Sequence, residues 1–313
     1  MKKIITLATI ILITIISCKD HSEDLDPVVD SSHLKYFGFT LVDTYWDDPT
    51  DNEAKTNYAD EVHSFSNMAD ILIAFPSQDI KPNLDVFQSY ELKAVLHLNE
   101  IFFEKVDTGG PSGAKYDLRA NYKARWDSVM TTNDLIENQN KLQALYIGEE
   151  PTWNDISASE FKSACDYAKQ TLPDVPILTV EAYPVLDEME IPSSVDWVGF
   201  DRYFIEDPQN NPVFLKDVAT LKSKINGEQK LVFIMDTHYI DWAHTDFGGI
   251  TKEELKGVAT SYYELAKSEE KAIGILGYFW PNGFDIEGSL GARGLPQSVK
   301  DEYVRIGKEI SGK

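Results

Sequence analysis

Eight short hydrophobic segments recur along the chain, separated by longer segments in which hydrophobic residues are spaced as on one face of a helix. Each short segment is nearly continuously hydrophobic, which is typical of strands that are buried on both faces of a parallel sheet. The expected strands cover residues 36–43, 69–76, 92–99, 142–149, 175–183, 195–203, 230–239 and 272–280.

The segments between these strands carry signals for the start of a helix. Ser157 with Glu160, and Thr251 with Glu254, have the spacing of a capping box. In that motif two side chains satisfy the free N–H groups of the first helical turn. The last helix is expected to begin near Pro296 and to bury a stripe of hydrophobic residues.

Eight strands that are each followed by a crossover predict an α/β protein, a single (β/α)8 TIM barrel over residues 34–313. Only eleven residues lie between Tyr183 and Val195. We therefore expect a shortened crossover between strands five and six, with one helical turn at most. An open doubly wound sheet is the alternative, but the glycine-rich phosphate turn that would favour it is missing after the first strand.

Residues 1–17 have the pattern of a signal peptide. Lys2 and Lys3 precede a hydrophobic run, Ile4 to Ile16, that is short for a membrane span. The run ends in IISC, which resembles the lipobox of bacterial lipoproteins, so Cys18 would carry a lipid anchor. An ordinary signal peptide followed by a chance cysteine is the alternative. Residues 18–33 are acidic, polar and without periodicity, and we expect a flexible tether.

These features predict export and anchoring to the bacterial outer membrane. The acidic residues after the cysteine also resemble the surface-export signal of Bacteroidetes lipoproteins. The net charge is −23 and no cluster of basic residues occurs, so nucleic acid is not an expected partner. Cys165 lies on the hydrophobic stripe of a predicted helix, which indicates a core residue and not a catalytic thiol. The tether and the charge favour a monomer.

The carboxyl ends of TIM-barrel strands share one face, and this face carries the active site. Every expected strand end has an aromatic residue within a few positions, and seven of the eight add a polar or acidic one. Rings stack on sugar C–H faces and carboxylates bind hydroxyls, so this face predicts a carbohydrate site. Phe75 and Phe103 are interpreted as rings that plug the barrel mouth. The candidate site residues are His97, Asn99, Glu149, Glu150, Trp153, Glu181, Tyr183, Asp201, Tyr203, Asp236, His238 and Trp280.

Glu149 and Glu150 stand side by side where the fourth strand ends. Cleavage of a glycosidic bond requires one carboxyl group that is protonated and a second that is ionised. A neighbouring carboxylate raises the pKa of a glutamate, so that it stays protonated near neutral pH. The pair therefore suits a general acid beside a group that binds substrate or sets the pKa of that acid.

Three motifs resemble a known family, the retaining TIM-barrel glycoside hydrolases that include cellulases, mannanases and β-galactosidases. GEEP (148–151) resembles the NEP motif of strand four, and DWVGFDRYF (196–204) and GYFWPN (277–282) are similar to strands six and eight. The resemblance covers strands four to eight. It implies Glu150 as the acid/base, Tyr203 as a partner near the nucleophile and Trp280 as the sugar platform.

The sequence departs from that family at two positions. Glu149 replaces the asparagine before the acid, and Asp236 replaces the glutamate nucleophile of strand seven. Asp236 could activate water in an inverting reaction, or the nucleophile could be lost, with Glu181 and Asp201 as rival second carboxyls. The adjacent acids also resemble the couple of substrate-assisted hexosaminidases, in which one acid orients an N-acetyl group.

We therefore predict an exported glycoside hydrolase that cleaves O-glycosidic bonds of a poly- or oligosaccharide without a cofactor. A non-catalytic carbohydrate-binding lipoprotein on the same barrel is the alternative. His97 and His238 are interpreted as hydrogen-bonding groups, because no close pattern of ligands specifies a catalytic metal. The acidic run 47–53 is interpreted as a solvated loop, with a calcium site as its alternative.

Overall fold

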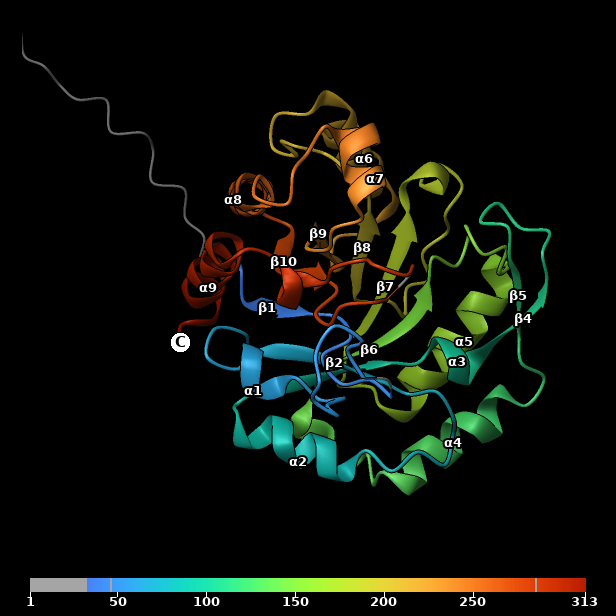
Figure 1. Cartoon of the computed structure of the whole chain (residues 1–313). Coiled ribbons are helices and arrows are strands. Elements are labelled where there is room, and N and C mark those ends of the chain that lie inside the picture. Colours follow the sequence, from blue (N-terminus) through green and yellow to red (C-terminus); the bar gives the residue numbers. More distant parts are fainter. Residues whose placement is uncertain (1–32, 46, 285) are drawn as a thin grey trace, which may run out of the picture.

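The computed structural model describes residues 33–45, 47–284 and 286–313, and it shows a barrel of parallel strands surrounded by helices (Figure 1). Eight strands form one sheet in the order β1-β10-β9-β8-β7-β6-β3-β2. The (β/α)8 TIM barrel that the hydrophobic pattern predicts is confirmed.

The barrel strands lie where the hydrophobic segments predict them. They are β1 (Tyr36–Phe39), β2 (Met68–Leu72), β3 (Lys93–His97), β6 (Leu142–Glu149), β7 (Ile177–Ala182), β8 (Trp197–Asp201), β9 (Lys230–Asp236) and β10 (Ala272–Tyr278). The barrel is closed between β1 and β2 by the segment after β1. There the Asp43 N–H donates to the Asp70 carbonyl at 3.1 Å, and the Leu72 N–H donates to the Asp43 carbonyl at 3.0 Å.

Helices and short helical turns connect the strands. The helices are α1 (Ala59–Val62), α2 (Lys81–Ser89), α3 (Asn99–Phe102), α4 (Tyr122–Thr132), α5 (Ala158–Thr171), α6 (Pro212–Lys224), α7 (Asp241–Ala243), α8 (Leu255–Ser268) and α9 (Gln297–Ser311). The turns are η1 (Gln139–Lys141), η2 (Tyr183–Val185), the π-helical η3 (His244–Gly248) and η4 (Ala292–Gly294). Within the described ranges no helix combines the length and the apolar character that crossing a membrane requires.

The predicted starts of α5 and α9 agree with the structure, whereas α8 starts three residues later than its capping box predicts. The capping box of α5 is complete, because the Ser157 hydroxyl accepts from the Glu160 N–H and the Glu160 carboxylate accepts from the Ser157 N–H. Before α8 only half of the box forms, where the Glu254 carboxylate accepts from the Thr251 N–H at 2.8 Å. The short connection between β7 and β8 contains only the three-residue η2, as its length predicts.

One element was not predicted. β4 (Phe103–Asp107) and β5 (Lys115–Leu118) form an antiparallel hairpin between α3 and α4, outside the barrel sheet. Its polar residues are more numerous than those of the barrel strands, and after Phe103 its residues are half-buried or exposed. Phe103 is fully buried at its start, whereas Phe75 is half exposed, so Phe75 does not plug the barrel.

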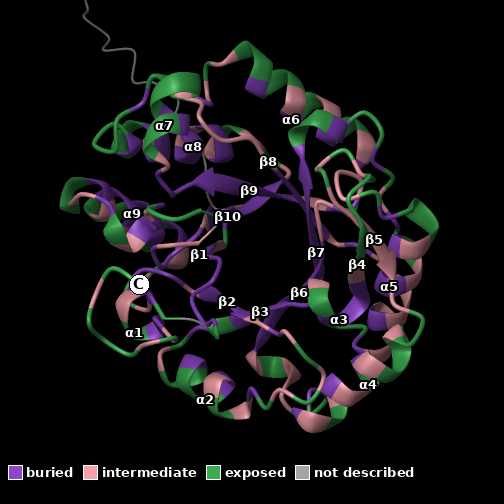
Figure 2. Cartoon of the chain, turned by 45° about the vertical axis from the view of Figure 1, so that its right-hand side comes forward, coloured by how far each residue is buried: buried purple, intermediate pink, exposed green. Residues whose placement is uncertain are grey.

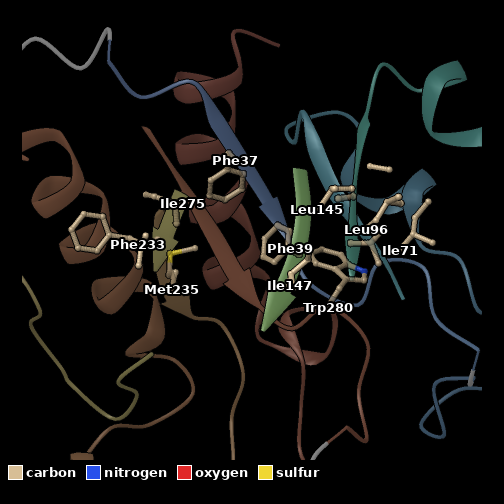
Figure 3. Packing of buried hydrophobic residues seen from close by; sticks show 14 of the residues in the cluster. Phe37, Phe39, Ile71, Leu96, Leu145, Ile147, Phe233, Met235, Ile275 and Trp280 are labelled. Atoms are coloured by element: carbon tan, nitrogen blue, oxygen red, sulfur yellow. The ribbon is translucent and has the colours of Figure 1, made fainter. Parts of the chain in front are cut away.

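The hydrophobic residues form two cores, which explains why the strands are continuously hydrophobic. Alternate residues of β9 belong to different clusters: Val232 and Ile234 face the barrel interior, whereas Phe233 and Met235 pack with residues of the surrounding helices (Figure 3). Figure 2 shows barrel strands that are mostly buried and helices that expose their outer faces. Burial of each such large side chain contributes roughly 1.5–3 kcal/mol. Cys165 lies buried in the outer core as a free thiol, as predicted.

Three of the sequence predictions concern residues outside the described ranges. They are the signal peptide (1–17), the lipid-bearing Cys18 and all but the last residue of the tether (18–33).

Candidate active site

A hollow of about 530 Å³ opens beside the carboxyl ends of β6, β7 and β8. Its walls come from these strand ends, from the segments that follow them and from η3. Glu150, Trp153, Tyr183, Asp201 and Tyr203 were predicted for the site, and the structure brings all five together here. The remaining lining residues are Ala182, Pro184, Arg202, Phe204, Ile205 and Phe247.

Glu150 sits in a backbone conformation that few residues with a side chain adopt. Its φ is +48°, and that of Gly148 is +79°. A side chain at Gly148 would be strained and would also lie 2.5 Å from the Phe161 ring, so only glycine fits there. The left-handed conformation of Glu150 costs about 1–3 kcal/mol, and such strain is typical of functional sites. It is held by the Glu150 N–H, which donates to the Val180 carbonyl at 2.8 Å.

The carboxyl groups of Glu150 and Asp201 are hydrogen-bonded to each other in this hollow. Burial, and then the charge of Asp201, raise the pKa of Glu150 far above its usual range. Burial also raises the pKa of Asp201. Two carboxyl groups in contact cannot both ionise near neutral pH, so the pair holds one proton.

Glu149 lies beside a positive charge, the protonated His97, whereas Glu150 lies beside another acid. One nitrogen of His97 lies 3.1 Å from the Glu149 carboxylate, and the other lies 3.2 Å from the buried carboxylate of Asp70. Burial by itself would lower the pKa of His97, but its bonds with Asp70 and Glu149 raise that pKa to about 10. Burial opposes the ionisation of Glu149, but the bond with His97 prevails and lowers its pKa. Neighbouring glutamates therefore have different protonation states, Glu149 ionised and Glu150 protonated.

Asp70 was missed by the sequence reasoning. It is fully buried in β2, and its carboxylate also accepts from the Leu41 N–H at 2.7 Å. The available signal was a single acid within the hydrophobic segment 69–76, because a buried charge requires a partner.

Glu181 supports the site without lining the hollow. Its buried carboxylate accepts from the N–H groups of Thr152 (2.8 Å), Trp153 (3.3 Å) and Ala182 (3.0 Å). Burial raises its pKa, and the backbone donors oppose that change. Glu181 thus fixes the turn that carries Trp153.

Of the candidate second carboxyls, the structure places Asp201 beside Glu150, whereas Asp236 lies elsewhere. Asp236 is 1% exposed and does not line the hollow. One of its oxygens accepts from the Phe204 N–H at 2.9 Å, and the other lies near two histidines. Burial opposes its ionisation, but the histidines lower its pKa well below the usual range. They are His238, predicted as a hydrogen-bonding group, and His244, which the sequence reasoning missed.

Trp280 also lies elsewhere than the family resemblance implies. It is 4% exposed in the outer core, where its ring packs against Phe39 at 4.8 Å (Figure 3). Its indole N–H donates to the Glu61 carboxylate at 2.8 Å. The ring that β10 places beside the hollow is Tyr278, which stacks on Tyr203 with centroids 5.2 Å apart.

Two further sequence predictions have structural outcomes. Asn99 begins α3 and does not line the hollow, and its buried side-chain oxygen has no hydrogen-bond partner among the described residues. The run 47–53 is not simply solvated: Asp48 is buried, and both Asp48 and Asp51 form ion pairs with Arg293. The arginine supplies the positive charge that a calcium ion would bring.

The fold resembles those of several glycoside hydrolases of known structure. A glucosidase from Croceicoccus marinus has a TM-score of 0.59 at 9% identity, over 89% of this chain and 67% of that chain. A β-glucuronidase from an uncultured Clostridium has 0.59 at 12%, over 88% and 50%. Xylanase 10B from Thermotoga maritima has 0.51 at 11%, over 90% and 98%.

The chain thus spans half of the glucuronidase and nearly all of the xylanase. No family model and no curated protein matches the sequence. At these identities the likeness establishes the fold alone: the chain is a (β/α)8 TIM barrel, a fold that it shares with these glycoside hydrolases.

Proposed function

We propose that this protein is a glycoside hydrolase that cleaves O-glycosidic bonds of a poly- or oligosaccharide, with Glu150 as the general acid. The observation that carries the proposal is the hydrogen-bonded Glu150–Asp201 pair in a hollow walled by aromatic rings. Sharing of one proton keeps Glu150 protonated near neutral pH, which is the state an acid catalyst needs.

In the proposed reaction Glu150 donates its proton to the glycosidic oxygen while the bond from that oxygen to the anomeric carbon breaks. A water molecule then adds to the anomeric carbon, and the proton that it loses returns to the carboxyl pair. Asp201, left as a carboxylate, stabilises the positive charge that develops at the anomeric carbon. Trp153, Tyr183 and Tyr203 offer ring faces on which the sugar stacks. Glu149 remains ionised because it is bonded to His97, and its charge disfavours loss of the Glu150 proton.

A second candidate function rests on the closeness of the same pair. Retaining glycosidases hold their two carboxyl groups about 5–5.5 Å apart, with the scissile bond between them. Glu150 and Asp201 are in direct contact, so a bound sugar must separate them before cleavage. If the pair stays closed, the hollow binds carbohydrate without cleaving it.

The two functions are separated by one substitution, Glu150→Gln, assayed on a panel of aryl glycosides and polysaccharides. If the protein is a glycosidase, wild type should release sugar and the variant should lose at least ~100-fold in kcat. Glu137→Gln, an exposed glutamate on the segment after α4, is the matched control and should keep full activity. Binding without release by both wild type and Glu150→Gln would favour the carbohydrate-binding protein.

We also propose that the protein is exported and anchored to the outer membrane through a lipid on Cys18, and that it acts as a monomer. The support is the sequence of residues 1–18. Labelling of cells with a radioactive fatty acid should mark the wild-type protein and leave Cys18→Ser unlabelled. Equal labelling of both would refute the anchor.

A further inference from the structure

A cluster of three buried side chains lies where β9 ends, apart from the residues that line the hollow. Asp236 is the last residue of β9, His238 follows two positions later, and His244 begins η3. Their exposures are 1%, 1% and 0%. One potential ligand atom from each of the three lies within 4.8 Å of the others.

His238 is not explained as a hydrogen-bond donor to Asp236. Its Nδ1 atom lies 3.1 Å from Asp236 Oδ1, yet by hydrogen-bond geometry this nitrogen has no partner among the described residues. A buried nitrogen without a partner is costly, and native structures rarely contain one. His238 Nδ1 and Asp236 Oδ1 lie close together without a hydrogen bond between them. Such a pair is expected when both atoms bind a third atom, such as a metal ion.

The two distances from Asp236 to the histidine nitrogens match those between ligands of a metal ion. In a tetrahedral zinc site with bonds of about 2.0–2.1 Å, neighbouring ligand atoms are roughly 3.3–3.4 Å apart. Asp236 Oδ1 lies 3.1 Å from His238 Nδ1 and 3.4 Å from His244 Nε2. One carboxylate and two imidazoles form a donor set that suits Zn²⁺, and their single negative charge is favourable for a divalent cation.

Hydrogen bonds behind the ligand atoms hold them in place. The other oxygen of Asp236 accepts from the Phe204 N–H at 2.9 Å. The Ile240 N–H donates to His244 Nδ1 at 3.0 Å, and the same nitrogen lies 3.1 Å from the Ile240 carbonyl oxygen. With Nδ1 as acceptor, Nε2–H donates to Asp236 at 3.4 Å; binding of a metal would move the proton to Nδ1, from where it donates to the Ile240 carbonyl and leaves the Nε2 lone pair for the ion.

We propose that Asp236, His238 and His244 form a binding site for one Zn²⁺ ion. The ion would tie the end of β9 to η3, which contributes Phe247 to the wall of the hollow. Three protein ligands leave the fourth position of a tetrahedral ion to water, and since none of the three lines the hollow, the ion would not contact a sugar bound there. The proposal does not depend on the glycosidase function.

The test is a metal titration of the full chain after treatment with a chelator. Elemental analysis of the protein dialysed against excess ZnCl2 should find one zinc per chain. Co²⁺ added to the stripped protein should give the visible absorption of a tetrahedral site. With Zn²⁺ a hundredfold above its Kd, the melting temperature should rise by roughly 5–10 °C.

His244→Gln and His238→Gln should each lose the cobalt absorption and the thermal shift. His63→Gln, which changes a histidine that stacks on Tyr90 far from the cluster in sequence, should keep both. The wild-type measurements decide the matter even if the two variants do not fold. Wild-type protein that keeps no zinc, gives no cobalt absorption and melts at the same temperature with and without metal would overturn the site. The histidines would then serve only as proton donors to Asp236.

Discussion

Asp201→Asn should move the alkaline limb of the pH–activity profile to lower pH. The amide has nearly the size of the carboxyl group, so the burial of Glu150 is unchanged, but the charge beside it is gone. The amide N–H₂ can also donate to the ionised form of Glu150. Both effects lower the pKa of Glu150, which burial and the charge of Asp201 together raise in the wild type.

The size of this shift follows from the contact between the two carboxyl groups. Two unit charges about 4 Å apart interact with about 4 kcal/mol at an effective dielectric constant of 20, and one pKa unit corresponds to about 1.4 kcal/mol. The charge of Asp201 therefore accounts for up to about 3 units. Since burial remains, the pKa of Glu150 should fall by ~1–3 units and stay above that of an exposed glutamate.

An acid catalyst is lost as the pH rises through its pKa, so the limb must move down in pH. The profile of kcat/KM against pH, measured on the best aryl glycoside, tests this for wild type, Asp201→Asn and the control Glu137→Gln. Infrared difference spectra of the protonated carboxyl band give the same pKa without turnover. An alkaline limb that stays in place or moves upward in Asp201→Asn would refute the shared proton.

Three further predictions concern stability. The pKa of His97 is about 10 in the folded protein and about 6.5 in the unfolded chain. His97 therefore adds up to about 4–5 kcal/mol to the free energy of unfolding below pH 6.5, and this contribution is lost as the pH rises toward 10. Between pH 6 and pH 9.5 the free energy of unfolding, measured in urea, should fall more for wild type than for His97→Gln. An equal fall in both proteins would contradict this. Gly148→Ala should lower the free energy of unfolding by roughly 2–4 kcal/mol, whereas Gly227→Ala, whose added methyl meets open space, should change it little. Trp280→Phe should destabilise the fold and leave the KM for sugars unchanged; a raised KM with unchanged stability would restore Trp280 as a platform.

The strands and several helix starts could be predicted because their signals are local. A hydrophobic run buried on both faces, or a serine three residues before a glutamate, specifies its own conformation without reference to the rest of the chain. The hairpin of β4 and β5 was missed because its strands are short and partly polar.

The partners within the site depend on information that the sequence does not carry locally. Whether a side chain at a strand end points to the hollow or to the outer core changes with each residue, because successive residues face opposite sides. Asp201 and Asp236 both end strands, yet only Asp201 reaches Glu150. Trp280 follows the end of β10 by two positions, where the chain has already turned into the core.

The hydrogen bonds that link Asp70, His97 and Glu149 separate two properties that many enzymes change together: the charge beside the general acid and the residues that contact the sugar. Asp70 belongs to β2, whereas the residues that line the hollow come from β6, β7, β8 and the segments after them. A substitution at Asp70 can alter the charge beside the general acid while every sugar-lining residue stays as it is. The pH range of the site can therefore change through a strand that contributes nothing to the wall of the hollow, with specificity preserved.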